Sequence, residues 1–121
     1  MKRRNFLSVL FLSLLHILLP GCASPRARNL DALNRFLLSL DKRKQLSLLG
    51  EKYLSLYPEE RERNLKAVLL SEAPTNIPNM TSYLQDRLAQ DFRTREIAQV
   101  SRWELSRTEA RICALVHLSE A

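Results

Sequence analysis

The sequence predicts an all-α fold: a small bundle of about five helices that follows a cleaved N-terminal signal. Apolar residues recur at helical spacing through most of the chain. Gly50 is the only glycine after residue 21, and no Asn-Gly or Asp-Gly pair marks a hairpin turn. We assign the signal to residues 1–21 and a single helical domain to residues 30–121, which is long enough for one core.

The first three helices of the domain are indicated by apolar stripes and by Pro58. The stripes of the first two helices are Leu30, Leu33, Phe36, Leu37 and Leu40, and then Leu46, Leu49, Tyr53 and Leu56. Pro58 fits the first turn of a third helix, where its missing N–H costs nothing. The buried side of that helix is marked by Leu65, Val68 and Leu69. The glutamates Glu59 and Glu60 are expected on a solvated face. The expected i,i+4 ion pairs are Glu59–Arg63 and Glu62–Lys66.

The second half of the domain is predicted to contain a loop, two more helices and a connector between them. Residues 71–79 form the loop because they hold two prolines and several cap-forming residues. The fourth helix has apolar residues one turn apart, and its end is supported by an Asp91–Arg95 pair. We expect a loop or a short strand from Ile97 to Trp103. The apolar residues of the fourth helix are Met80, Leu84, Leu88 and Phe92.

The last helix is the best-defined element of the sequence. Ser106 and Glu109 form a capping box, in which each side chain bonds to the backbone N–H of the other residue. Leu105 and Ala110 occupy the positions of a hydrophobic staple. One narrow face carries small residues, so we expect another helix to approach it closely. That face is Ala110, Cys113, Ala114 and His117.

The first 24 residues have the layout of a bacterial export signal. Three basic residues precede an apolar run from Phe6 to Leu19, which is followed by Pro20, Gly21 and Cys22. Leu19-Pro20-Gly21-Cys22 resembles the lipobox of bacterial lipoproteins, although Pro20 departs from the usual residue. That resemblance implies cleavage before Cys22 and diacylglycerol on its thiol, with residues 22–29 as the lipidated cysteine and a linker. Arg3, Arg4, Phe6 and Leu7 resemble the core of a twin-arginine translocation signal.

Other interpretations of this segment remain open. The apolar run is 14 residues long, whereas a membrane-spanning helix needs about 17–25 residues. There are two alternatives to lipidation: the segment could stay as an uncleaved membrane anchor, or an ordinary signal peptidase could cut after Ala23. The basic start serves the general secretory route as well as the twin-arginine route. With a lipid on Cys22, the domain would be exported and anchored facing the periplasm. Ala23-Ser24 lacks the aspartate that often retains lipoproteins at the inner membrane, which favours the inner leaflet of the outer membrane.

Charge and cysteine content limit the function classes. Removing the signal removes three basic and no acidic residues, so the net charge falls from +6 to +3. We therefore expect no nucleic-acid partner, and the mild positive balance suits an anionic membrane surface. A lipidated Cys22 leaves Cys113 without an intramolecular disulfide partner. Cys113 is then a small buried residue, or else an intermolecular or redox-active thiol.

The sequence contains no catalytic, metal-binding or cofactor motif, so we predict a non-enzyme that binds no cofactor. His117 is the only histidine after the signal, and Cys113 with His117 falls short of a zinc ligand set. Ser119 and Glu120 lie near His117 in sequence, which is weak support for a nucleophilic triad. One glycine after the signal is too few for a glycine-rich phosphate loop.

A possible partner surface surrounds the connector and the start of the last helix. Its residues are Arg102, Trp103, Arg107 and Arg111, and Trp with Arg is the composition of interface anchors. The alternative is that Trp103 belongs to the core and the arginines are simply solvated. Trp103–Leu115 also resembles a WxLSxTExRxCAL stretch of small exported bacterial proteins of unassigned function. These are faintly similar to the small subunits of membrane-bound flavin-dependent sugar dehydrogenases, which implies a role in export and assembly beside a flavin-bearing subunit.

The sequence therefore favours a lipid-anchored accessory or interaction protein of the bacterial cell envelope, held to the membrane by its anchor and bound to a protein partner. A small export or assembly subunit of a membrane-bound oxidoreductase is the alternative. A free-standing enzyme that depends on His117 is a third hypothesis.

Overall fold

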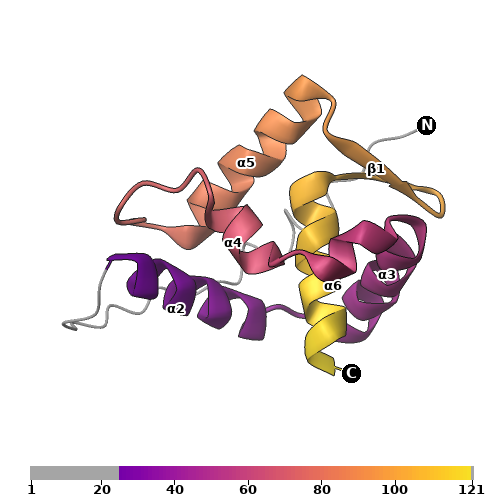
Figure 1. Ribbon diagram of the computed structural model, residues 1–121, viewed down its shortest axis with the longest axis horizontal. Helices are drawn as coiled ribbons and strands as arrows, with labels where there is room; N and C mark the ends of the chain where they lie inside the picture. The colour runs from indigo at the N-terminus through magenta and orange to yellow at the C-terminus, as the bar shows by residue number, and fades with distance from the viewer. Residues whose placement is uncertain (1–24, 121) are drawn as a thin grey trace.

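The computed structural model describes residues 25–120, so the predictions for the signal, including Cys22, lie outside the described residues. The prediction of a mainly helical bundle is confirmed: five α-helices, one short 3-10 helix and a two-stranded sheet make up the described chain (Figure 1). The elements in order are α2 (Pro25–Leu38), α3 (Arg43–Leu56), η1 (Pro58–Glu62), α4 (Leu65–Leu70), α5 (Met80–Thr94), β1 (Ile97–Val100), β2 (Trp103–Ser106) and α6 (Arg107–Glu120).

Helix α2 begins at Pro25, within the segment that we expected to be a linker. Proline is tolerated in the first turn of a helix, so the helix can start there. Asn29 ties this end of α2 to the loop before α5, because its amide donates to the carbonyl of Pro74 at 3.1 Å and its Oδ1 accepts from the N–H of Ile77 at 3.2 Å. Asn29, which is buried, is thus part of the packed domain.

The centre of the fold is the crossing of α3 and α6, which share the most extensive helix–helix contact of the described chain. Gly50 lies against the backbone of α6, where a Cβ would overlap the carbonyl oxygen of Cys113. Ala110 and Ala114 are fully buried on the facing side. The prediction that the small-residue face of the last helix admits a close neighbour is confirmed, and Gly50 is the residue that approaches it.

Two apolar clusters flank this crossing, and the partly buried Leu49 and Leu115 pack against both of them. The first cluster joins α2 to α3, α4, α5 and α6. The second joins the end of α3 to the sheet and the start of α6. The second cluster consists of Tyr53, Leu54, Leu65, Ala98, Val100, Leu105, Ala110 and Ala114.

The predicted third helix is divided into two pieces. Pro58 does begin a helical turn, but η1 ends at Glu62 and Arg63 is extended, with φ −95° and ψ 150°. Asn64 then starts α4 by accepting a hydrogen bond from the N–H of Ala67 at 3.2 Å. Because the helix breaks at Arg63, the predicted pairs Glu59–Arg63 and Glu62–Lys66 are wrong for this structure.

A β-hairpin occupies the segment before α6, where we expected a loop or a short strand. Strands β1 and β2 are antiparallel, with Ile97 opposite Ser106 and Val100 opposite Trp103. Ser101 makes the turn with φ 57°, a conformation usually taken by glycine. The second strand was missed because this turn has no glycine.

The start of α6 is capped twice. Ser106 and Glu109 form the predicted capping box, in which both hydrogen bonds measure 2.9 Å. A further bond comes from α5, where Asp91 accepts from the N–H of Thr108 at 2.7 Å. Asp91 is buried and forms no ion pair with Arg95, so that predicted pair is wrong.

In the part of the chain that the structure describes, no helix is long and apolar enough to cross a membrane.

Candidate functional site

The main polar feature of the domain is the carboxylate of Glu60, which is only 1% exposed. It lies on η1, between the end of α3 and the middle of α6. Its Oε1 accepts hydrogen bonds from the Tyr53 hydroxyl at 2.7 Å and from Nε of Arg111 at 2.8 Å. Its Oε2 accepts from Arg63 at 3.0 Å. A buried carboxylate is tolerated only when it is paired and hydrogen-bonded in this way. The expectation of a solvated Glu59-Glu60 face is therefore wrong for Glu60, while Glu59 is exposed.

The surroundings of Glu60 determine its charge. Burial would raise the pKa of Glu60, but hydrogen bonds from Arg111, Tyr53 and Arg63 and the charge of Arg111 outweigh it and lower the pKa to about 2. Burial, together with the hydrogen bond to Glu60, raises the pKa of Tyr53 to about 12. Burial opposes the charged form of Arg111, yet Glu60 raises its pKa overall. At neutral pH the carboxylate is ionised and the phenol is protonated.

Arg107 lies at the edge of this group of side chains. Its Nη1 donates to the Tyr53 hydroxyl at 3.1 Å, and its guanidinium lies 4.4 Å from the centroid of the Tyr57 ring. The Tyr53 and Tyr57 rings are themselves 5.0 Å apart. We call Glu60 together with Arg63, Arg107 and Arg111 the arginine cluster. Arg63 and Arg111 bind the carboxylate directly, and Arg107 is joined to it through the Tyr53 hydroxyl. Three cations thus accompany one anion, so the cluster carries surplus positive charge.

The structure separates the four residues of the predicted partner surface. Arg107 and Arg111 come together in the arginine cluster, and the side chain of Arg111 is 13% exposed because it turns toward Glu60. Arg102 is exposed at the hairpin turn. Trp103 is half-buried on β2 and packs against the second apolar cluster, as Tyr57 does.

Sequence reasoning missed four residues of this site: Tyr53, Tyr57, Glu60 and Arg63. One signal for three of them is their spacing, because Tyr53, Tyr57 and Glu60 follow one another at four and three residues. That is the spacing of one helix face. A glutamate on the same face as two tyrosines is a sign of a buried polar contact rather than a solvated one.

Cys113 and His117 have separate structural roles. Cys113 is buried and forms no disulfide, in agreement with the prediction of a small core residue. Burial raises the pKa of its thiol, and the charge of Glu109 adds to the effect.

Nδ1 of His117 is 3.1 Å from the hydroxyl of Ser47, whereas Ser119 and Glu120 bond to Arg43. Within residues 25–120, no three His, Cys, Asp or Glu side chains gather in a way that could hold a metal ion.

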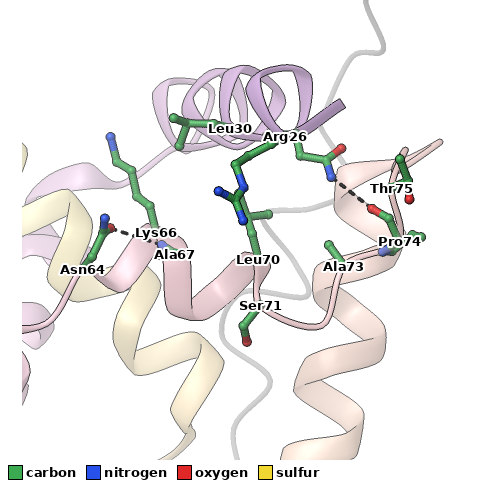
Figure 2. Close-up of a pocket in the computed structure, with 11 residues that line it drawn as sticks. Arg26, Leu30, Asn64, Lys66, Ala67, Leu70, Ser71, Ala73, Pro74 and Thr75 are labelled. Carbon is green, nitrogen blue, oxygen red and sulfur yellow. Dashed lines mark hydrogen bonds between the residues drawn. The ribbon is translucent and has the colours of Figure 1, made fainter. Parts of the chain in front are cut away.

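A second surface feature is a groove of about 810 Å³ between α2, α4 and the loop that follows α4. Figure 2 shows Arg26 reaching from α2 toward α4 and Lys66 reaching from α4 toward α2. The polar rim includes Asn64, which caps α4, and Asn29, which is bonded to Pro74. The lining residues are Arg26, Asn29, Leu30, Asn64, Lys66, Ala67, Leu70, Ser71, Ala73, Pro74 and Thr75.

Comparison of the chain with protein-family models, with curated proteins and with solved structures finds no match. The fold and the site therefore define a class in physical terms alone: a small helical domain with a buried carboxylate that is paired to two arginines, and with a separate basic groove.

Proposed function

We propose that this chain is a non-catalytic, lipid-anchored accessory protein of the bacterial cell envelope that holds an acidic segment of a partner protein at the arginine cluster. The location rests on the signal, in which Cys22 carries the lipid and the domain faces the periplasm. The binding role rests on Arg107.

The observation that carries the binding role is the state of the Arg107 side chain. It is half-buried and donates one hydrogen bond, to Tyr53, and its other N–H donors have no acceptor among residues 25–120. An arginine offers five donors in a planar fork that matches a carboxylate. The ring of Tyr57 and the hydroxyl of Tyr53 already fix this fork in place. Pre-positioning lowers the entropy lost on binding.

Glu60 supports this role from beneath. Its carboxylate binds Arg111 and one edge of Arg63, whereas the guanidinium of Arg107 donates only to Tyr53 among the described residues. Arg63 is half exposed, at 47%, and adds a second positive charge at the rim. An incoming carboxylate would therefore meet two guanidinium groups without displacing Glu60. Arg102 adds a further exposed positive charge at the hairpin turn.

The anchoring part of the proposal is tested on the full chain expressed in a bacterium. We expect labelled palmitate to be incorporated into the wild type and the protein to fractionate with membranes. Cys22→Ala should lose both properties. An unlabelled wild type that is released in soluble form would exclude the anchor.

The binding part is tested by in vivo cross-linking from a photoreactive residue placed at the exposed position 102. The expected result is a discrete adduct in the wild type that Arg107→Ala abolishes. Arg61→Ala is the matched control, because Arg61 is an exposed arginine of η1 with no hydrogen bond or ion pair to another described residue. Arg107→Lys should not restore the adduct, because lysine cannot offer the planar fork. Equal adducts in all variants would overturn this role.

A further inference from the structure

The groove between α2 and α4 has the chemistry of an anion site. Arg26 and Lys66 both line it, and neither forms a hydrogen bond or ion pair with another residue of the described chain. No aspartate or glutamate is among its lining residues. Two unpaired cations on facing helices, with no acid between them, favour a ligand that carries negative charge.

The rest of the lining suits a ligand that also has an apolar part. Leu30 is 40% exposed at the mouth of the groove, although it belongs to the apolar stripe of α2. Leu70, Ala73 and Pro74 continue this apolar surface on the other side. The volume of about 810 Å³ lies within the range of small-molecule sites. A molecule with an anionic phosphate next to an apolar body would satisfy both kinds of lining.

The position of Arg26 in the chain indicates where such a ligand would come from. Arg26 is four residues after Cys22. Four residues span at most about 14 Å even when fully extended. If Cys22 carries acyl chains in a bilayer, the backbone of Arg26 cannot lie far from the phosphate groups of the same leaflet.

We propose that this groove binds the headgroup of an anionic phospholipid, with the phosphate between Arg26 and Lys66 and the glycerol and first methylenes against Leu30 and Leu70. The source of the ligand rests on the proposed lipid anchor, whereas the recognition rests on the groove alone. Binding at this site would hold α2 against the membrane and fix the orientation of the anchored domain.

The test is a calorimetric titration of the purified full chain, held in solution by a zwitterionic detergent. The ligands are dihexanoyl-phosphatidylglycerol, dihexanoyl-phosphatidylcholine and inorganic phosphate. We expect the wild type to bind the phosphatidylglycerol and neither of the other two. Arg26→Ala and Lys66→Ala should each weaken binding by about fivefold, the effect of one basic residue at an anionic surface.

The matched control is Arg28→Ala. Arg28 is an exposed arginine of the same helix, two residues from Arg26, but it does not line the groove. Its removal should leave the affinity unchanged, and thermal unfolding should show that all three variants remain folded. An equal loss in Arg28→Ala, binding of phosphatidylcholine with the same affinity, or binding of free phosphate would each overturn the proposal.

The same titration on Cys22→Ala separates this proposal from the proposed anchor. If the wild type incorporates no palmitate but Cys22→Ala still binds phosphatidylglycerol selectively, the groove proposal stands and the anchor proposal fails. If the wild type is acylated but shows no selective binding, the anchor proposal stands and the groove proposal fails.

Discussion

Tyr53 donates its phenolic hydrogen to Glu60 at 2.7 Å, and this bond joins the end of α3 to η1 across the break at Tyr57. The same phenol oxygen accepts from Arg107 of α6 at 3.1 Å. The hydroxyl of one tyrosine thus links α3, η1 and α6. The carboxylate beneath it connects Arg63 and Arg111 in the same way.

Replacement of Glu60 by glutamine should destabilise the domain. The change leaves Arg111 and Arg63 facing a neutral amide inside a buried group of donors, and breaking such a pair costs about 3 kcal/mol. Urea unfolding of Glu60→Gln and of Glu59→Gln measures the difference. Glu59 is exposed one residue away, so its substitution should change the free energy of unfolding by less than about 0.5 kcal/mol. Equal values for the two variants would contradict the assigned role of Glu60.

Lowering the pH should remove the contribution of Glu60 to the free energy of unfolding. The pKa of Glu60 is lowered from 4.5 to about 2 in the folded domain, so the unfolded chain takes up this proton first as the pH falls. The contribution of Glu60 is therefore fully present above about pH 4.5 and is lost progressively toward pH 2. In Glu60→Gln, the stability measured between these two pH values should decline less steeply than in the wild type. Parallel curves for the two proteins would show that Glu60 does not control this range.

Gly50→Ala should be strongly destabilising, although the opposite is usual in helices. Replacing glycine by alanine within a helix normally stabilises it by about 0.5–1 kcal/mol. Here the new methyl group would overlap the carbonyl of Cys113, so α3 and α6 must separate. Overpacking of this kind costs about 1–3 kcal/mol. Ser55→Ala, at an exposed position of α3, is the control for thermal unfolding, and a Gly50→Ala domain at least as stable as the wild type would show that the crossing is looser than described.

Asp91→Ala should weaken the start of α6 from a distance of 17 residues. The substitution leaves the buried N–H of Thr108 without its acceptor, and a lost cap costs about 1–2 kcal/mol. Asp86→Ala removes an exposed aspartate of the same helix and should be close to neutral. Amide hydrogen exchange should show faster exchange at Thr108 in the first variant alone. Unchanged protection there would mean that the capping box is sufficient.

The thiol of Cys113 should be unreactive in the folded domain. It is 1% exposed, and burial raises its pKa, so little thiolate is available. In a Cys22→Ala background, Cys113 is the remaining cysteine, and a disulfide reagent should label it only as fast as the domain opens. Ser55→Cys in that background gives the rate of an exposed thiol on α3. Similar rates for the two positions would exclude the buried environment.

The features that were predicted correctly are those that depend on residues close together in the sequence. The capping box lies within four residues, and the small face of α6 within eight. Glu60 was misjudged because the group that allows its burial, Arg111, is 51 residues away and is invisible to local periodicity. Asp91 was misjudged for the same reason, since a local Arg95 was the nearer candidate.

The break at Arg63 and the hairpin turn were missed for a different reason. Both depend on residues that allow several conformations, Asn64 as a helix cap and Ser101 in the left-handed region. Neither residue type specifies its conformation without the packing around it. The charged groove could not be foreseen at all, because Arg26 and Lys66 line one groove only through the packing of α2 against α4.

The central position of α6 also sets the timing of folding during synthesis. Both apolar clusters include residues of this helix: Ala110 and Ala114 in one, and Ile112, Cys113 and Val116 in the other. The chain emerges from the ribosome N-terminus first. The residues of α2 to α5 are therefore made before α6, the helix against which they pack. The core cannot close before about residue 116 has been made. Throughout this interval the proposed export signal is attached to an open chain, which is the form that a channel for unfolded polypeptides accepts.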